Sequence, residues 1–116
     1  MAVDTSGTTI IAEGTKLDGK IEISSKLHID GEISGTIHSK NIVTIGTKGM
    51  VKGEIYADKL VVSGHFDGNV DCREVEILAG GKVVGDVISS ILVIESKAFF
   101  EGTSKVKLDS DPINIE

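Results

Sequence analysis

The stretch KLHIDGEISGTI at residues 26–37 returns as KLVVSGHFDGNV at residues 59–70, thirty-three residues further along the chain. Lys, Leu and two Gly occupy equivalent places in both copies, and apolar residues of the first copy match apolar residues of the second. The apolar residues alternate with a period of two, which is typical of a β-strand and not of a helix. A repeated strand pattern therefore determines the fold.

A shorter unit lies inside this repeat and consists of an apolar residue, any residue, Gly, any residue and a second apolar residue. It occurs as LDGKI at 17–21, ISGTI at 33–37, VKGEI at 51–55, FDGNV at 66–70, VVGDV at 83–87 and, in degenerate form, FEGTS at 100–104. Between these copies stand short alternating segments, which are LHI at 27–29, VTI at 43–45, LVV at 60–62, VEI at 75–77 and LVI at 92–94. Successive glycines of the unit are 15 to 18 residues apart.

Each cycle thus holds about three short strands separated by bends. One such strand cannot bury its apolar side alone, but stacked cycles pair each strand with its equivalents and share one apolar axis. We predict an all-β fold, a right-handed parallel β-helix of about six triangular coils over residues 8–108. The tails at 1–7 and 109–116 are predicted to be disordered. The right hand follows from the general preference of parallel crossovers and from the variable coil length, which a left-handed hexapeptide helix tolerates badly.

The outward residues beside the repeated glycines are compatible with this stacking. Preceding the glycines are Asp18, Ser34, Lys52, Asp67, Val84 and Glu101, and following them are Lys20, Thr36, Glu54, Asn69, Asp86 and Thr103. Neighbours in each column never share a charge sign, so the predicted stack places no like charges opposite one another there.

The composition excludes several functions. A net charge of −6 argues against nucleic acid as a partner, because phosphate binding needs clustered Lys and Arg. The glycines do not form a GxxxxGK[ST] loop, so no nucleotide is expected. The single cysteine, Cys72, cannot form an internal disulfide and fits a reducing compartment. The first residues do not resemble a secretion signal, and no apolar run reaches the roughly 18 residues of a membrane span, so a cytoplasmic location is expected.

No cofactor, metal site or catalytic site is predicted, and the protein is not expected to be an enzyme. The histidines His28, His38 and His65 are all expected to point outward, but they occupy different positions of the repeat and so do not form a metal site. Serine pairs fall at bends, where small polar residues are common, and none lies beside a histidine.

The ends of the predicted solenoid lack recognisable caps. A terminal coil exposes unpaired backbone groups over an apolar core, and natural sheets usually protect such edges. Here the first coil carries Ile10 and Ile11, and the last carries ILVI at 91–94 with Phe99 and Phe100. The two phenylalanines could simply plug the end of the core. We favour the alternative that Phe99, Phe100, Ile10 and Ile11 form polymerisation interfaces between stacked copies.

The repeated glycine motifs, the six coils of about 17 residues and the entry TTIIAEGTKLDGKIEI resemble the bactofilins over residues 8–108. The resemblance implies a cytoskeletal right-handed β-helix that assembles without nucleotide into non-polar filaments, through head-to-head and tail-to-tail contacts. It also implies roles in cell shape and in scaffolding peptidoglycan-modifying enzymes at the inner membrane. Phe99 and Phe100 match the terminal phenylalanines that support the tail joint in this family.

Many bactofilins also carry a short membrane-targeting segment at the N-terminus. Here only Met1, Ala2 and Val3 precede the first charge at Asp4, so these three residues are the candidates for membrane contact. A weak anchor of this kind could act through the avidity of a filament.

Two other classes of function fit the sequence less well. A left-handed β-helix enzyme, such as a hexapeptide acyltransferase or a γ-carbonic anhydrase-like protein, needs strict hexapeptides and histidine sites between subunits, and both are missing. A carbohydrate-binding or ice-binding solenoid needs ranks of Thr or aromatic residues on a flat face. Several apolar residues are expected to point outward or to lie at bends, and these are Val61, Leu78, Val84, Val93 and Phe99. They could contact a partner protein, a neighbouring filament or a membrane, and the sequence does not distinguish these alternatives.

Overall fold

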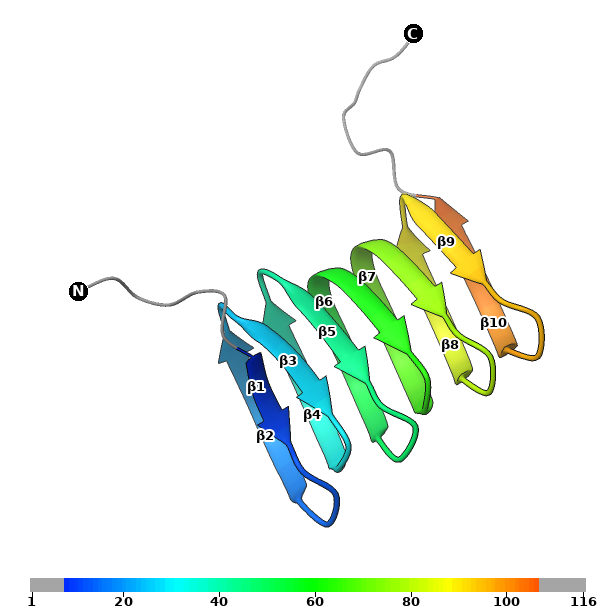
Figure 1. Cartoon of the computed structure of the whole chain (residues 1–116). Coiled ribbons are helices and arrows are strands. Elements are labelled where there is room, and N and C mark those ends of the chain that lie inside the picture. Colours follow the sequence, from blue (N-terminus) through cyan, green and yellow to red (C-terminus); the bar gives the residue numbers. More distant parts are fainter. Residues whose placement is uncertain (1–7, 107–116) are drawn as a thin grey trace, which may run out of the picture.

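The computed structural model describes residues 8–106, and within this range every regular element is a β-strand (Figure 1). The strands are β1 (Thr8–Ile11), β2 (Lys16–Ile23), β3 (Lys26–Ile29), β4 (Glu32–Ser39), β5 (Ile42–Ile45), β6 (Met50–Val62), β7 (His65–Ile77), β8 (Lys82–Ser89), β9 (Ile91–Ile94) and β10 (Phe99–Val106). A search of the same residues for a helix long and apolar enough to cross a membrane finds none.

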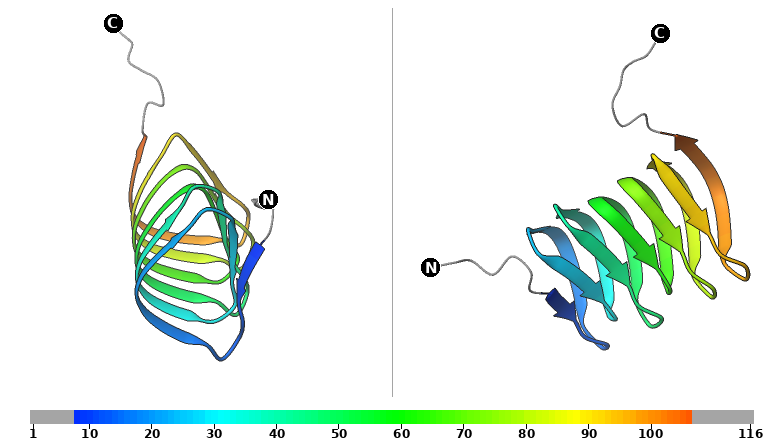
Figure 2. Two further views of the ribbon diagram at one scale, coloured as in Figure 1. Left: turned by 90° about the vertical axis from the view of Figure 1, so that its left-hand side faces the viewer. Right: turned by 45° about the horizontal axis from the view of Figure 1, so that its top comes forward.

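All strand pairs are parallel and join equivalent positions of successive coils. One ladder runs through the eight-residue segments, from β2 to β4, β6, β7, β8 and β10. A second runs through the four-residue segments, from β1 to β3, β5, β6, β7 and β9. In the left view of Figure 2, successive coils repeat a similar outline one after another along the stack, so the chain forms a solenoid.

The repeated glycines form one column through the whole stack. Gly19, Gly35, Gly53, Gly68, Gly85 and Gly102 are paired in register from the first coil to the last. Each has a φ between +129° and +140°, a conformation that L-residues with a side chain rarely adopt. The chain turns a corner there, and the long strand divides into two arms.

The number of strands per coil differs from the sequence-based expectation. About three short strands were expected, whereas each coil has two strands, which are fused in β6 and β7. The reason is that the glycine corner bends the backbone without interrupting its pairing to the neighbouring coils, so both arms belong to one strand. The coil nevertheless has three sides, made of the two arms and the short strand.

The core is filled by the inward residues of each side. The largest buried side chain is Phe66, which stacks between Val51 and Val83 in the column of the first arm. Ile, Val and Leu fill most of the equivalent positions of the other sides, and the many β-branched residues among them suit a pleated surface. Cys72 is buried in this core as a small apolar residue.

The all-β parallel solenoid of about six coils is thus confirmed, together with the register of both outward columns beside the glycines. The right-handed sense remains a prediction. The predicted tails at 1–7 and 109–116, the end of the core domain at 108, and the membrane candidates Met1, Ala2 and Val3 lie outside the described residues.

Candidate assembly surfaces

The two ends of the solenoid are open sheet edges within residues 8–106. At the N-terminal end, β1 pairs with β3 and β2 pairs with β4, and no described strand lies on their other side. At the C-terminal end, β9 pairs with β7 and β10 pairs with β8, again on one side alone among these residues. Each end therefore presents unpaired backbone donors and acceptors along two strands.

The N-terminal end also presents part of the apolar core. Leu17 begins the core column of the first arm and is 40% exposed, because no described coil covers it. Ile21 and Ile23 pack on the core and remain partly accessible. Of the two residues predicted from the sequence, Ile11 is 8% exposed and belongs to the core, whereas Ile10 is 65% exposed on the outer side of β1.

The C-terminal end has the same construction. Phe100 points inward, pairs in register with Val83 and packs on the core while remaining partly accessible. Phe99 points outward and is 46% exposed, and Nζ of Lys82 lies 5.2 Å from the centre of its ring. Ile94 ends a core column of the short strands and is as exposed as Phe99, at 45%. Phe99 thus lies on the outer side of β10, as the alternation predicted, while Phe100 lies on its inner side.

Sequence reasoning missed Leu17, and it named Ile94 only within the apolar run ILVI at 91–94, without assigning it to an interface. Both occupy inward positions of the repeat, which are buried in every inner coil and uncovered only in the terminal ones. The signal was present, because Leu17 opens the first copy of the glycine unit. The prediction instead followed local hydrophobicity and chose Ile10 and Ile11.

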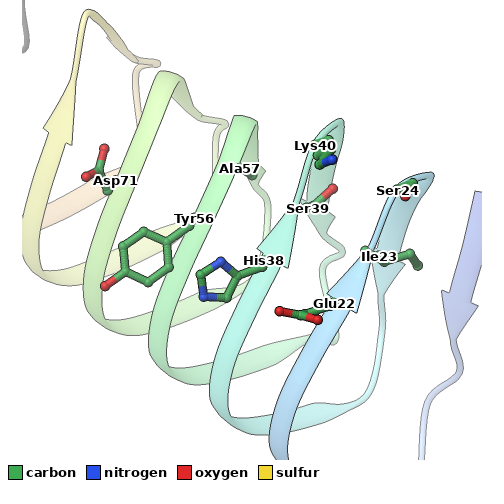
Figure 3. Close-up of a pocket in the computed structure, with 9 residues that line it drawn as sticks. All are labelled: Glu22, Ile23, Ser24, His38, Ser39, Lys40, Tyr56, Ala57 and Asp71. Carbon is green, nitrogen blue, oxygen red and sulfur yellow. The ribbon is translucent and has the colours of Figure 1, made fainter.

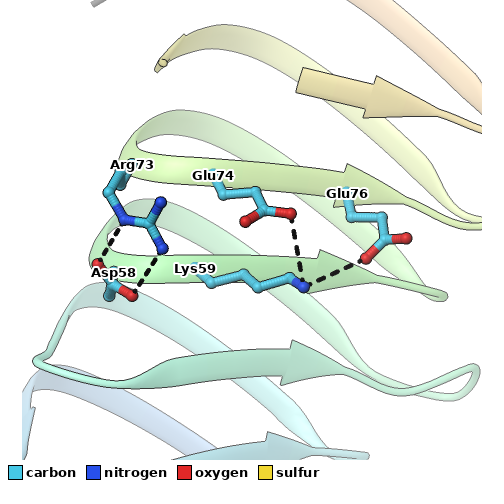
Figure 4. Close-up of polar contacts among 5 residues, drawn as sticks. All are labelled: Asp58, Lys59, Arg73, Glu74 and Glu76. Carbon is cyan, nitrogen blue, oxygen red and sulfur yellow. Dashed lines mark hydrogen bonds and ion pairs between the residues drawn. The ribbon is translucent and has the colours of Figure 1, made fainter. Parts of the chain in front are cut away.

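One side of the solenoid is crossed by ion pairs between coils (Figure 4). Nζ of Lys59 on β6 lies 3.5 Å from a carboxylate oxygen of Glu74 and 3.6 Å from one of Glu76, both on β7. Arg73 donates two hydrogen bonds to Asp58, of 3.0 and 3.3 Å, and these bonds hold the pKa of Asp58 below its usual value. The contacts join neighbouring coils, so they support the stack.

Replacing Lys59 by alanine is expected to lower the free energy of unfolding by about 1 kcal/mol, because two neighbouring carboxylates on β7 lose their shared cation. The side chains of this cluster are less than 30% exposed. Lys48→Ala is the matched control, since its pair with Glu13 has a similar distance of 3.5 Å but is 65% exposed or more. Urea unfolding should show a clearly smaller loss for Lys48→Ala, and equal losses would contradict the role of burial.

A groove runs along the second arm of the coils (Figure 3). It has a volume of about 750 Å³, and its floor includes the stacked rings of His38 and Tyr56, whose centroids are 4.8 Å apart. The Tyr56 hydroxyl donates a 3.0 Å hydrogen bond to Glu54, and this carboxylate raises the pKa of Tyr56.

The histidines are partly buried side chains on the outside of the coils, as the alternation predicted. His28 contacts Asp30 at 3.1 Å, and His38 stacks on Tyr56. Among residues 8–106, no three His, Cys, Asp or Glu side chains gather as a metal site would need.

Within residues 8–106, a solenoid that presents apolar core residues at both open ends has the form expected of a protein that assembles by stacking. The family model for bactofilin, described as polymer-forming cytoskeletal, matches residues 9–105, and the chain belongs to this family. Bactofilin BacO of Myxococcus xanthus (strain DK1622) is 28% identical over 95 residues, which are 81% of this chain and 75% of BacO. Bactofilin BacP of the same organism is 25% identical over 95 residues, and the chain spans 40% of its length.

Solved structures agree with this assignment. A chain from the cryo-EM reconstruction of Thermus thermophilus bactofilin double helical filaments matches with a TM-score of 0.82 at 20% identity, over 85% of this chain and 99% of that one, which shows the shared fold. The cytoskeletal bactofilin BacA, determined by solid-state NMR, gives a TM-score of 0.76 at 27% identity, over 87% of this chain and 95% of that one. The protein is therefore a polymer-forming cytoskeletal component and not an enzyme.

Proposed function

We propose that this protein polymerises end to end, without nucleotide, through alternating head-to-head and tail-to-tail joints between solenoids. The observation that carries the proposal is the pair of open edges within residues 8–106, each with core residues that remain partly accessible: Leu17 at one end, and Phe100 and Ile94 at the other. Phe99 and Ile10 lie on the outer rims of the same ends, and Ile11 supports the N-terminal end from within the core.

The physical basis is the completion of a sheet and of a core at the same time. A second copy on either end pairs the edge strands and removes the terminal apolar side chains from water. Burial stabilises such a joint by about 25 cal/mol per Å² of apolar surface, and backbone pairing adds direction. No hydrolysable ligand is needed for either contribution.

The cellular role that we propose is a cytoplasmic scaffold for cell-shape machinery, with peptidoglycan hydrolases or other cell-wall proteins as its partners. Family membership supports this role. The groove along His38 and Tyr56 is a second surface, which runs along the side of the coils from Glu22 on the first coil and could receive such a partner. Contact of Met1, Ala2 and Val3 with the inner-membrane surface is part of the same proposal, and neither nucleotide nor nucleic acid takes part in it.

Electron microscopy of the purified protein in nucleotide-free buffer tests the assembly. We expect filaments of constant width whose axial repeat corresponds to two opposed subunits. Addition of ATP or GTP should change neither the amount nor the length of polymer. A protein that remains monomeric at high concentration, or a compact trimer, would refute the proposal.

A further inference from the structure

We infer that the N-terminal joint is an antiparallel pairing of β2 with β2 of a second copy, centred on Gly19. The inference rests on the proposed end-to-end assembly and specifies which residues meet. The sequence of β2 is KLDGKIEI, and its first seven residues are complementary to themselves when read in opposite directions about the glycine. A two-fold interface requires this property, because the same patch must fit its own copy.

The charges of β2 supply the complementarity. A two-fold axis at Gly19 places Lys16 opposite Glu22 of the partner subunit, and Asp18 opposite Lys20 of the partner subunit. Both relations occur twice, so four opposite-charge pairs and no like-charge pair cross the joint. Opposite charges on facing strands stabilise pairing, and like charges weaken it. Within the subunit, Lys20 and Glu22 form an exposed 3.4 Å contact, which leaves both side chains accessible to a partner.

The apolar residues obey the same symmetry. Leu17 and Ile21 are equidistant from Gly19 and belong to the inward columns, so each meets the other across the joint and the two cores become continuous. Under the two-fold axis at Gly19, the first arm of β2 faces the second arm of β2 in the partner subunit. The third side of this coil is β1, and it faces β1 of the partner subunit. Ile10 lies midway between the inward-column positions Thr9 and Ile11, so it meets Ile10 of the partner subunit. This contact would cover the apolar side chain that is 65% exposed in the single subunit.

The steric situation at Gly19 also fits a second backbone at this position. A Cβ built on any of the five later glycines of the column would lie 1.8–1.9 Å from the carbonyl oxygen of the glycine in the preceding coil. At Gly19 the same direction is open, with no atom within 4 Å, although φ is the same at +132°. The first coil thus keeps a conformation suited to close stacking on the side where no coil from residues 8–106 lies.

A head-to-tail joint would be less favourable. Continuing the parallel columns from β10 to β2 places Glu101 of one subunit beside Asp18 of the next, which is a like-charge contact. One opposite pair, Lys105 with Glu22, compensates for it, whereas the two-fold joint has four opposite pairs. The charge pattern therefore favours the two-fold arrangement and a filament without polarity.

Charge exchange tests this register, and the measurement is made in a Phe100→Arg background so that the N-terminal joint is studied alone. Sedimentation equilibrium of that variant gives the dimer dissociation constant. Asp18→Lys and Lys20→Asp, each alone, should raise this constant by about tenfold or more, since two attractive pairs become repulsive. The double variant D18K/K20D should bring it back to within about threefold of the parent, because every pair is opposite again.

The matched control is K52E/E54K, which exchanges the charges of the residues that occupy the same two columns in an inner coil. It should leave the dimer dissociation constant unchanged. A second readout uses Ile10→Cys, which should form a disulfide-linked dimer under mild oxidation, since directly opposed strand residues lie within disulfide reach. Thr44→Cys, in the same outward column of an inner coil, should not.

The outcomes separate the register from the assembly itself. Wild-type protein that stays monomeric refutes the proposed function and the joint together. Filaments from the wild type, combined with failure of D18K/K20D to restore association and no disulfide from Ile10→Cys, refute the Gly19-centred register and leave end-to-end assembly standing.

Discussion

Phe100→Arg is expected to replace long filaments by dimers. Phe100 is the last inward residue of the column that contains Phe66 and Val83, and it lies uncovered at the C-terminal end. A two-fold joint would bury two such rings, each worth about 1.5–3 kcal/mol. Arginine removes this burial and brings two guanidinium groups into a desolvated site, so the joint should weaken by about a hundredfold or more. The N-terminal joint is untouched and still yields dimers.

Phe99→Arg is the matched control, because Phe99 is adjacent in sequence but points outward beside Lys82. It should weaken assembly far less than Phe100→Arg. Sedimentation velocity and electron microscopy measure the size distribution, and far-ultraviolet circular dichroism verifies that both variants keep their strands. Filaments of wild-type length from folded Phe100→Arg protein would contradict the role assigned to the C-terminal end.

The register of the solenoid could be predicted from sequence because the glycine corner allows no alternative. A position that needs φ near +130° and has a carbonyl group packed against it accepts glycine alone, so one residue type marks every coil. Counting the intervals between these glycines gives the register of all neighbouring residues. The alternation then assigns inward and outward positions, including the burial of Phe66 and the outward direction of His65.

Features that depend on contacts between coils were harder to predict. The ion pairs of Lys59 with Glu74 and Glu76 depend on long side chains reaching across two strands, and many other cation and carboxylate combinations are compatible with the same columns. The groove at His38 and Tyr56 is lined by residues from several neighbouring coils, so its shape depends on how those coils lie against one another. At the N-terminal end, hydrophobicity pointed to Ile11, whereas inward position and lack of a covering coil together identify Leu17.

Gly53→Ala is expected to destabilise the fold far more than the same substitution at a glycine that has open space around it. Gly53 lies in the middle of the stack, and a Cβ there would be 1.9 Å from the carbonyl oxygen of Gly35 and 2.8 Å from its carbonyl carbon. Both atoms are backbone, so two coils would have to separate and lose paired hydrogen bonds. Together with the cost of φ at +129° for alanine, the loss should reach about 4 kcal/mol or more.

Gly80→Ala distinguishes the steric clash from backbone strain. Gly80 also has a positive φ, of +85°, but a Cβ built there meets no atom within 4 Å. This control should lose only about 1 kcal/mol, which is the ordinary cost of forcing alanine into the left-handed region. Urea unfolding in the Phe100→Arg background keeps filaments out of the measurement, and equal protein concentrations keep the remaining dimerisation the same for both variants. A domain of this size is stabilised by about 5–15 kcal/mol in total, so the Gly53→Ala variant should be close to unfolding. Equal losses of unfolding free energy in the two variants would show that contact between coils does not select glycine in this column.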